Sequence, residues 1–218
     1  MRSRSSAGAN AAEHEGLAVI ALIDYGAGNL TSVRKGFAAV GAELYTPATP
    51  TDLDRAHAIV VPGVGHFAAT AGLQGPWTEA IRGAVARRVP LLGICLGLQW
   101  LFEGSDEAPN VEGLGAIAGT CSRLPQGGGL KVPHVGWNSL HVSQSSRLLT
   151  GVAENVQVYF THSYAAPVTP ETAATCEHGA RFAAAVESGN IFGVQFHPEK
   201  SSEAGLRMLR NFAAAAQG

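Results

Sequence analysis

The fold is decided by the stretch Leu91-Leu92-Gly93-Ile94-Cys95-Leu96-Gly97. Its first four residues form an apolar run of the length typical of a strand buried on both faces. Its last five follow the pattern glycine–x–nucleophile–x–glycine, which places a reactive side chain on a tight turn from a strand into a helix. The two glycines lack Cβ atoms, so neighbouring backbone can pass close to the strained nucleophile. We therefore expect a strand over residues 91–94, a turn at Cys95 and a helix over residues 97–102.

Apolar runs on both sides of this stretch predict further strands and helices. The expected strands span residues 17–24, 43–45, 58–61, 156–160, 182–186 and 192–196, and helical spacing of apolar residues covers 30–40, 77–85 and 206–212. Gly41 is placed to end the first helix, Pro76 to begin the second, and Ser201 or Ser202 to cap the last. Alternating strands and helices predict an α/β fold with a doubly wound, mostly parallel, flavodoxin-like sheet and helices on both faces.

The region between residues 113 and 142 departs from this rhythm. Its apolar runs are shorter, and Gly127, Gly128 and Gly129 suggest a flexible connection. We expect hairpins here and an antiparallel extension at the edge of the sheet.

The chain length fits one domain. A chain of 218 residues with 46% hydrophobic residues can bury roughly 70% of its unfolded surface in a single core. Residues 1–16 are rich in Ser, Ala and Gly and offer nothing to pack, so we expect a disordered extension followed by one domain over residues 17–218.

Charge and cysteine content narrow the class of protein. The net charge of −2 gives no general attraction to nucleic acid or to an anionic membrane. The first apolar run is far shorter than the roughly 20 residues of a membrane helix, and acidic rather than basic residues precede it. Cys95, Cys121 and Cys176 form an odd set without CxxC spacing, so we expect no disulfide, no metal site and a reducing, cytoplasmic location.

Partners for Cys95 stand near the C-terminus, in Gln195-Phe196-His197-Pro198-Glu199. Pro198 is expected to keep this stretch extended, and side chains two residues apart on an extended chain share a face. Glu199 can then orient the His197 ring and fix its tautomer. The ring can serve Cys95 as general base and then as general acid.

Each half of this triad also has a simpler interpretation. Cys95 alone could be an inert buried thiol, and an isolated His-Pro-Glu segment could be a surface turn. In a doubly wound sheet, however, the carboxyl ends of the parallel strands gather at one edge, which would bring Cys95 and His197 together. The start of the helix after Cys95 also favours the thiolate and lowers a pKa that is ordinarily about 8.5.

Acyl transfer needs N–H donors for a tetrahedral oxyanion. The N–H of Leu96, directly after the nucleophile, is one candidate. A second could come from Pro62-Gly63-Val64-Gly65, which follows the strand predicted at residues 58–61, although an ordinary Gly-Pro loop explains that segment equally well. The residues by themselves thus predict cysteine-dependent amide hydrolysis and leave the substrate open.

Together these motifs resemble the class I, triad-type glutamine amidotransferases, and most closely their bacterial imidazole glycerol phosphate synthase branch. The resemblance runs from about Ala18 to the last helix. Its markers are Asp24-Tyr25-Gly26-Ala27-Gly28-Asn29, Pro62-Gly63-Val64-Gly65, Gly93-Ile94-Cys95-Leu96-Gly97-Leu98-Gln99, Gly136-Trp137-Asn138 and Phe196-His197-Pro198-Glu199. Most of the class has two adjacent glycines where this chain has Gly63-Val64-Gly65, and this departure distinguishes the branch.

The resemblance implies roles for residues that spacing alone leaves open. It implies that glutamine is held by Gly63, Gln99, Glu107, His162, Ser163 and Tyr164, and that the Gly136-Trp137-Asn138 turn faces a partner near an ammonia passage. Otherwise Glu107 would be a solvated loop charge, Gln99 the polar side of a helix and Trp137 ordinary core. It also implies that Val64 and Leu96 supply the oxyanion donors.

The partner implied by the resemblance is a cyclase subunit with a (β/α)8 barrel, which forms a heterodimer with the glutaminase. Ammonia from L-glutamine would there join a ribonucleotide to give imidazole glycerol phosphate and aminoimidazole carboxamide ribonucleotide in histidine biosynthesis, without a cofactor. Val64 adds an expectation about regulation. If turning a loop N–H toward the oxyanion requires positive φ at Val64, that conformation costs about 1–3 kcal/mol for a β-branched residue, and the free chain would keep the inactive arrangement. We expect the isolated chain to be a poor glutaminase.

Three alternatives are kept open. A glutaminase subunit of another branch, such as that of pyridoxal phosphate synthase, is disfavoured by Val64 and by the Gly-Trp-Asn segment. A stand-alone cysteine hydrolase would act on peptides or larger acyl groups instead of free glutamine. A non-catalytic binding module would show no reaction of Cys95 with a glutamine-derived electrophile.

Overall fold

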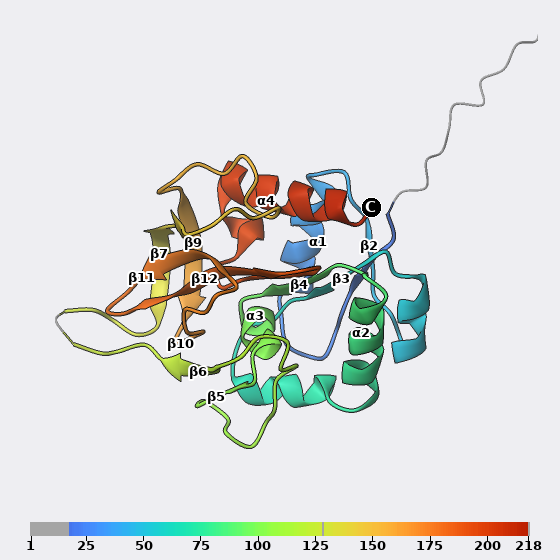
Figure 1. Ribbon diagram of the computed structural model, residues 1–218, viewed down its shortest axis with the longest axis horizontal. Helices are drawn as coiled ribbons and strands as arrows, with labels where there is room; N and C mark the ends of the chain where they lie inside the picture. Colours follow the sequence, from blue (N-terminus) through green and yellow to red (C-terminus); the bar gives the residue numbers. More distant parts are fainter. Residues whose placement is uncertain (1–17, 128, 218) are drawn as a thin grey trace, which may run out of the picture.

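The computed structural model describes residues 18–127 and 129–217 (Figure 1). The expected extension over residues 1–16 lies outside the described residues, as do the first residue of the expected domain, Leu17, and the middle glycine of the predicted connection, Gly128.

An eight-stranded sheet forms the centre of the molecule. Its strands are β1 (Ile20–Leu22), β2 (Leu44–Tyr45), β3 (Ala58–Val61), β4 (Leu91–Ile94), β8 (His141–Val142), β11 (Thr172–Glu177), β12 (Arg181–Ser188) and β13 (Ile191–Val194). They lie in the order β2-β1-β3-β4-β13-β12-β11-β8. The first five strands are parallel, and the last three pair antiparallel. The predicted doubly wound sheet with an antiparallel extension is confirmed.

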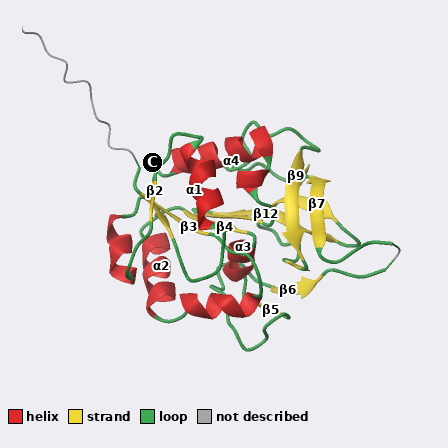
Figure 2. Cartoon of the chain, turned by 180° about the vertical axis from the view of Figure 1, so that it is seen from behind, coloured by secondary structure: helices red, strands yellow, loops and turns green. Residues whose placement is uncertain are grey.

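Helices cover both faces of this sheet (Figures 1 and 2). On one face lie α1 (Leu30–Ala38) and α4 (Ser202–Ala215); on the other lie α2 (Pro76–Ala86), α3 (Leu96–Leu101) and the 3₁₀ helices η1 (Pro50–Arg55) and η2 (Phe67–Leu73). The parallel strands feed both cores with a period of two. Ile20 and Leu22 join Phe37 and Phe212 in one core, and Ala21 and Ile23 belong to the other.

Two smaller sheets flank the carboxyl edge. One consists of β10 (Tyr164–Ala165), β6 (Thr120–Arg123) and β5 (Gly104–Ser105), and the other pairs β7 (His134–Ser139) with β9 (Gln157–His162). The predicted hairpins were wrong, because β6, β7 and β8 each pair with strands outside residues 113–142. Within the described part of that stretch, the only internal pairing is the bridge between Gly127 and Leu130. Turn residues show where a chain can bend, but the strands with which β6, β7 and β8 pair are selected by burial against parts of the chain that are distant in sequence.

Two helix ends show what the capping signals predict. Gly41 has φ +78°, and the N–H groups of Gly41 and Ala42 donate to the carbonyls of Ala38 and Phe37, as in a Schellman motif. Ser201 precedes α4, but its side chain does not cap the helix. Its hydroxyl instead donates to the His197 carbonyl at 2.6 Å and accepts the Tyr159 N–H at 3.0 Å. The predicted side-chain cap at Ser201 was therefore wrong.

The sheet order reverses between β1 and β3, and the carboxyl ends of β1, β3, β4 and β13 lie along one edge. The segments that follow these strands begin with Ile23, Pro62, Cys95 and Gln195, and they carry four of the sequence motifs. Ligands of doubly wound folds bind at such a reversal, so the fold itself selects this edge as the site.

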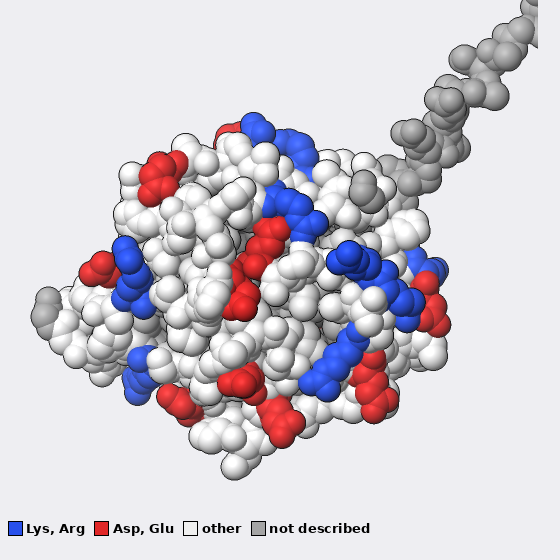
Figure 3. Space-filling view, viewed as in Figure 1, with Lys and Arg blue, Asp and Glu red and all other residues white. Residues whose placement is uncertain are grey.

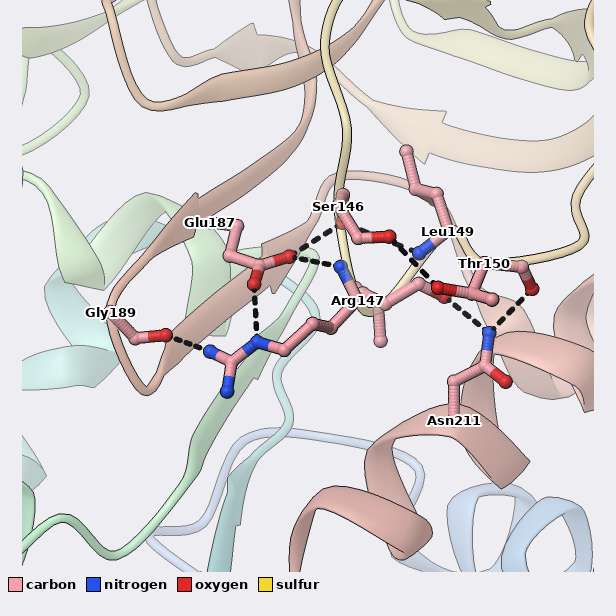
Figure 4. Close-up of polar contacts among 8 residues, drawn as sticks. Ser146, Arg147, Leu149, Thr150, Glu187, Gly189 and Asn211 are labelled. Atoms are coloured by element: carbon pink, nitrogen blue, oxygen red, sulfur yellow. Dashed lines mark hydrogen bonds and ion pairs between the residues drawn. The ribbon is translucent and has the colours of Figure 1, made fainter.

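A polar network joins residues 146–150, which precede β9, to the end of β12 and to α4 (Figure 4). The Glu187 carboxylate at the end of β12 accepts the Ser146 hydroxyl at 2.6 Å, the Arg147 N–H at 2.8 Å and the Arg147 Nε–H at 2.8 Å. Arg147 also donates to the Gly189 carbonyl, and the Asn211 amide of α4 donates to two carbonyls of the same segment. The Glu187 side chain is only 14% exposed.

We expect Glu187→Ala to lower the free energy of unfolding by about 2–3 kcal/mol, because it removes a half-buried charged acceptor of three hydrogen bonds. For a chain of this size the melting temperature should fall by roughly 4–10 °C. The matched control is Asp54→Ala, which breaks the exposed Arg87–Asp54 pair at 3.3 Å and should change stability by less than about 1 kcal/mol. Equal urea midpoints for the two variants would contradict the assignment of Glu187 as a clamp.

On the face seen in Figure 3, acidic and basic side chains are interspersed, and charges of one sign do not form a single large patch. Across the described ranges, none of the helices has the length and apolar character needed to cross a bilayer.

Candidate active site

Cys95 stands on the sharp turn that the sequence predicts. Its backbone has φ +54° and ψ −104°, a region that side-chain-bearing residues rarely adopt and that stores about 1–3 kcal/mol of strain. A Cβ on Gly93 would lie 2.5 Å from the Gly97 carbonyl oxygen, and one on Gly97 would lie 1.8 Å from the Val61 carbonyl oxygen. Both flanking positions therefore require glycine.

His197 and Glu199 form a buried pair. The distance from His197 Nδ1 to Glu199 Oε1 is 2.9 Å, and the two side chains are 3% and 2% exposed. The pairing was expected, but its geometry was not: only His197 is extended, and Pro198, Glu199 and Lys200 form the 3₁₀ helix η3 (Pro198–Lys200). Proline restricts the residue before it, so it left Glu199 free to turn back toward the ring.

Charge around His197 favours its protonated form. Burial alone would lower the pKa of His197, but interactions with Cys95 and Glu199 outweigh that effect and raise the pKa to about 9. Nε2 of the ring is buried and has no hydrogen-bond partner among the described residues. At neutral pH the arrangement therefore favours the imidazolium form of His197.

The Cys95 sulfur has two polar neighbours besides the histidine. The thiol can donate to the Thr161 carbonyl oxygen at 3.9 Å, and the side-chain amide of Gln195 donates to the sulfur at 3.7 Å. Gln195 is fully buried. Gln195 was not among the predicted site residues, although it is the one amide in the apolar run that leads to His197.

A cavity of about 270 Å³ opens beside the sulfur. It is lined by Gly65, Cys95, Leu96, Gln99, Glu107, Pro133, Thr161, His162, Ser163 and Tyr164. Five of the predicted substrate-binding residues thus surround the candidate nucleophile. Gly63 and Val64 line a small neighbouring crevice that His197 and Glu199 also border.

The polar groups of the cavity wall are held in place. The Gln99 amide donates to the Tyr164 carbonyl at 2.8 Å, and His162 Nδ1 lies 3.0 Å from the same oxygen. Glu107 accepts the Phe67 N–H at 2.7 Å, so it is not merely a solvated loop charge. This preorganised wall suits a small, zwitterionic substrate with several polar groups.

The loop after β3 presents a carbonyl to the expected oxyanion position. The Leu96 N–H donates to the Gly63 carbonyl oxygen at 3.4 Å. Gly65 has φ +102°, whereas Val64 is not among the described residues with positive φ. One predicted donor is therefore occupied, and the Gly63–Val64 peptide directs its oxygen, not its N–H, toward Leu96.

Tyr25 anchors this loop and was not predicted as part of the site. Its hydroxyl donates to the Pro62 carbonyl at 2.7 Å, and a Cβ on Gly63 would meet that hydroxyl at 2.2 Å. Burial and the charge of Cys95 raise the pKa of Tyr25, so the hydroxyl stays a donor.

The predicted partner-facing residues lie on a strand and not in a turn. Trp137 and Asn138 belong to β7, with Gly136 at φ +132° before them. Trp137 is 51% exposed and Val135 is 57% exposed, so Trp137 is not core. Val135 pairs with Thr161, whose carbonyl faces Cys95, so this exposed apolar face lies one strand away from the nucleophile.

Comparison with known proteins agrees with this architecture. The family model for class I glutamine amidotransferases matches residues 21–216. The imidazole glycerol phosphate synthase subunit HisH of Methanothermobacter thermautotrophicus is 48% identical over 196 residues, covering 89% of this chain and 97% of that protein. The protein of the same name from Moorella thermoacetica is 46% identical over 197 residues, covering 88% and 93%.

A solved structure described as a glutamine amidotransferase has a TM-score of 0.71 over 92% of this chain and 99% of its own, at 18% identity. That likeness concerns the fold alone. The alignments with the two HisH proteins extend over more than 90% of each of those proteins at more than 45% identity. The family model includes all four strand ends that form the site. The chain therefore belongs to the class I glutamine amidotransferases and, within them, to the family of imidazole glycerol phosphate synthase subunit HisH.

Proposed function

We propose that this chain is the glutaminase subunit of imidazole glycerol phosphate synthase and hydrolyses L-glutamine to glutamate and ammonia. The observation that carries the proposal is the strained Cys95, which opens into the polar cavity beside the buried His197–Glu199 pair. The relatives' names provide the synthase, and the cavity's size suits a single amino acid better than a peptide.

The residues can carry out the reaction in two halves. The Cys95 thiolate attacks the side-chain carboxamide carbon of glutamine, and a C–S bond forms. The His197 imidazolium gives its proton to the amide nitrogen, the C–N bond breaks and ammonia leaves a thioester. Neutral His197 then takes a proton from water, the resulting hydroxide attacks the thioester, and C–S cleavage releases glutamate. Glu199 stabilises the imidazolium and holds the tautomer.

The oxyanion of both tetrahedral intermediates requires donors that the resting loop does not offer. The Leu96 N–H is bonded to the Gly63 carbonyl, and rotation of the Gly63–Val64 peptide would replace that oxygen with the Val64 N–H. Such a rotation drives φ of Val64 toward positive values, which a β-branched residue resists. We assign Val64 and Leu96 as donors that act only after this rotation.

The partner in this proposal is a cyclase subunit with a (β/α)8 barrel, docked over β7 and β9 in a cytoplasmic heterodimer. The exposed Val135 and Trp137 provide an apolar surface of the kind found at interfaces. Because Trp137 and Asn138 lie one strand from the nucleophile, ammonia released there has a short path to a partner on this face.

The test is steady-state glutamate production by the chain alone, by its complex with the cyclase, and by the complex with the cyclase's nucleotide ligand. We expect low, intermediate and high rates, because a missing oxyanion donor costs about 10²–10³ in rate. Val64→Gly should raise the rate of the isolated chain about tenfold, since glycine removes most of the conformational penalty.

The matched control is Val168→Gly, an exposed valine in a loop outside the cavity, which should leave all three rates unchanged. Equal rates in the three states of the wild type would rule out the loop mechanism. Hydrolysis of glutaminyl peptides as fast as of free glutamine would instead favour a stand-alone hydrolase.

A further inference from the structure

Gln195 is a fully buried amide next to the reacting sulfur. It follows β13 two residues before His197, and its Nε2 lies 3.7 Å from Cys95 Sγ. A buried amide without partners would destabilise the fold, so its position calls for hydrogen bonds on both its nitrogen and its oxygen. Here the oxygen faces Gln99, and the nitrogen faces the sulfur.

The orientation of this amide follows from a carbonyl that can only accept. The Tyr164 carbonyl oxygen lies 2.8 Å from a Gln99 amide atom, which must therefore be the nitrogen. That same nitrogen lies 3.3 Å from Gln195. Two NH₂ groups facing each other would repel, so Gln195 presents its oxygen to Gln99. Its NH₂ group is thereby directed at Cys95.

A second chain of hydrogen bonds fixes the same carbonyl. The His162 Nδ1–H donates to Tyr164, His134 Nδ1 lies 3.1 Å from His162 Nε2, and the Asn138 amide lies 3.3 Å from His134 Nε2. Burial lowers the pKa of His134 to about 4 and that of His162 to about 3, so both rings are neutral at pH 7 and the donor directions stay fixed. With two donors on its oxygen, the Tyr164 carbonyl holds Gln99 in one orientation.

The two neighbours of the sulfur have opposite effects on its proton. The Thr161 carbonyl can only accept, so it favours the S–H form. The Gln195 N–H can only donate, so it favours the thiolate, since a charged sulfur accepts far more strongly than a thiol. Removal of the amide would leave the carbonyl as the remaining uncharged polar neighbour among the described residues.

We propose that Gln195 stabilises the Cys95 thiolate as an amide donor, and that Gln99 and the Tyr164 carbonyl hold it in the donating orientation. The proposal rests on the proposed function only in taking Cys95 as the nucleophile. The titratable groups that face the sulfur from the surrounding elements are His197 with Glu199 behind it, the Tyr25 hydroxyl, and Glu107, His162 and Tyr164 in the cavity wall. Gln195→Met keeps all of them and removes only the amide.

The experiment is the pH dependence of Cys95 alkylation by iodoacetamide, with the site located by peptide mass spectrometry. We expect the midpoint of Gln195→Met to rise by about 1 pH unit and its alkylation rate at pH 7 to fall about tenfold. With glutamine, kcat should fall by a similar factor while KM stays within about twofold. Cys121 and Cys176 are buried thiols with raised pKa values, so they contribute little below pH 9.

The matched control is Asn190→Leu, which removes a structural amide that donates to the Val85 and Val89 carbonyls far from the sulfur. It should lower stability without moving the alkylation midpoint. An unchanged midpoint in folded Gln195→Met would overturn the proposal. Because alkylation needs no glutamine, a shifted midpoint would support the role of Gln195 even if the complex with the cyclase and its ligand showed no glutaminase activity, a result that would contradict the proposed function alone.

A measurement on the wild-type sequence covers the case in which Gln195→Met does not fold. The side-chain amide protons of Gln195, followed by NMR in ¹⁵N-glutamine-labelled protein, should shift with the same midpoint as Cys95 alkylation, and Cys95→Ala should abolish that shift. Amide protons that do not respond to pH between 5 and 9 in the wild type would overturn the proposal.

Discussion

Cys95→Ala should abolish glutamine-dependent synthesis by the complex with the cyclase, by at least about 10⁴-fold, while leaving synthesis from added ammonium salts intact. The sulfur is the only nucleophile on the strained turn, and the cavity opens directly onto it. Removing a nucleophile leaves only the rate that binding and oxyanion donors provide. The measurement compares imidazole glycerol phosphate formation with glutamine and with ammonium chloride.

Cys121→Ala provides the matched control, because it removes a buried thiol that donates only to the Gln99 backbone carbonyl. Both rates should survive that change within about threefold. Substantial glutamine turnover by the Cys95→Ala complex would refute the assigned nucleophile, and loss of the ammonium-dependent rate would point to damaged assembly instead.

His197→Asn should disable acyl-enzyme formation more severely than Glu199→Gln, by roughly 10²-fold. The asparagine removes the proton carrier itself. In Glu199→Gln, the side-chain amide retains an oxygen that can accept the Nδ1–H of His197, which in the wild type lies 2.9 Å from Glu199 Oε1. The ring therefore stays oriented. The same substitution removes the negative charge of Glu199, which helps raise the pKa of His197, so less imidazolium is present at neutral pH.

The measurement is the single-turnover release of ammonia from glutamine in the activated complex. His57→Asn serves as control, since that ring only accepts the Val19 N–H at the opposite end of the sheet. Equal rates for Glu199→Gln and His197→Asn would show that the carboxylate does more than orient and stabilise the ring.

The parallel core could be predicted from the sequence because each of its strands carries its own signal. The runs at residues 58–61 and 91–94 are apolar throughout and match β3 and β4. The strand β11 (Thr172–Glu177) was missed, because its alanines and threonines are weakly apolar and become buried only through pairing with β12 and β8. Burial that depends on a distant partner leaves no local pattern.

The same distinction holds for the site. Cys95 and the His197–Glu199 pair lie in short motifs whose glycines and proline are visible in the sequence. Gln195 and Tyr25 act through contacts with residues 100 and 37 positions away, with Cys95 and Pro62, and no spacing rule connects such pairs. The conformation of Val64 likewise could not be predicted, because a loop sequence does not state which way a peptide group faces.

The backbone of Tyr159 makes two hydrogen-bond connections to the segment that contains His197 and Glu199. Its carbonyl accepts the His197 N–H at 2.9 Å, and its N–H donates to the Ser201 hydroxyl, which in turn binds the His197 carbonyl. Tyr159 also pairs with Trp137 across the ribbon. The exposed Trp137 and the buried His197 are thus connected through a single residue, Tyr159, which contacts both.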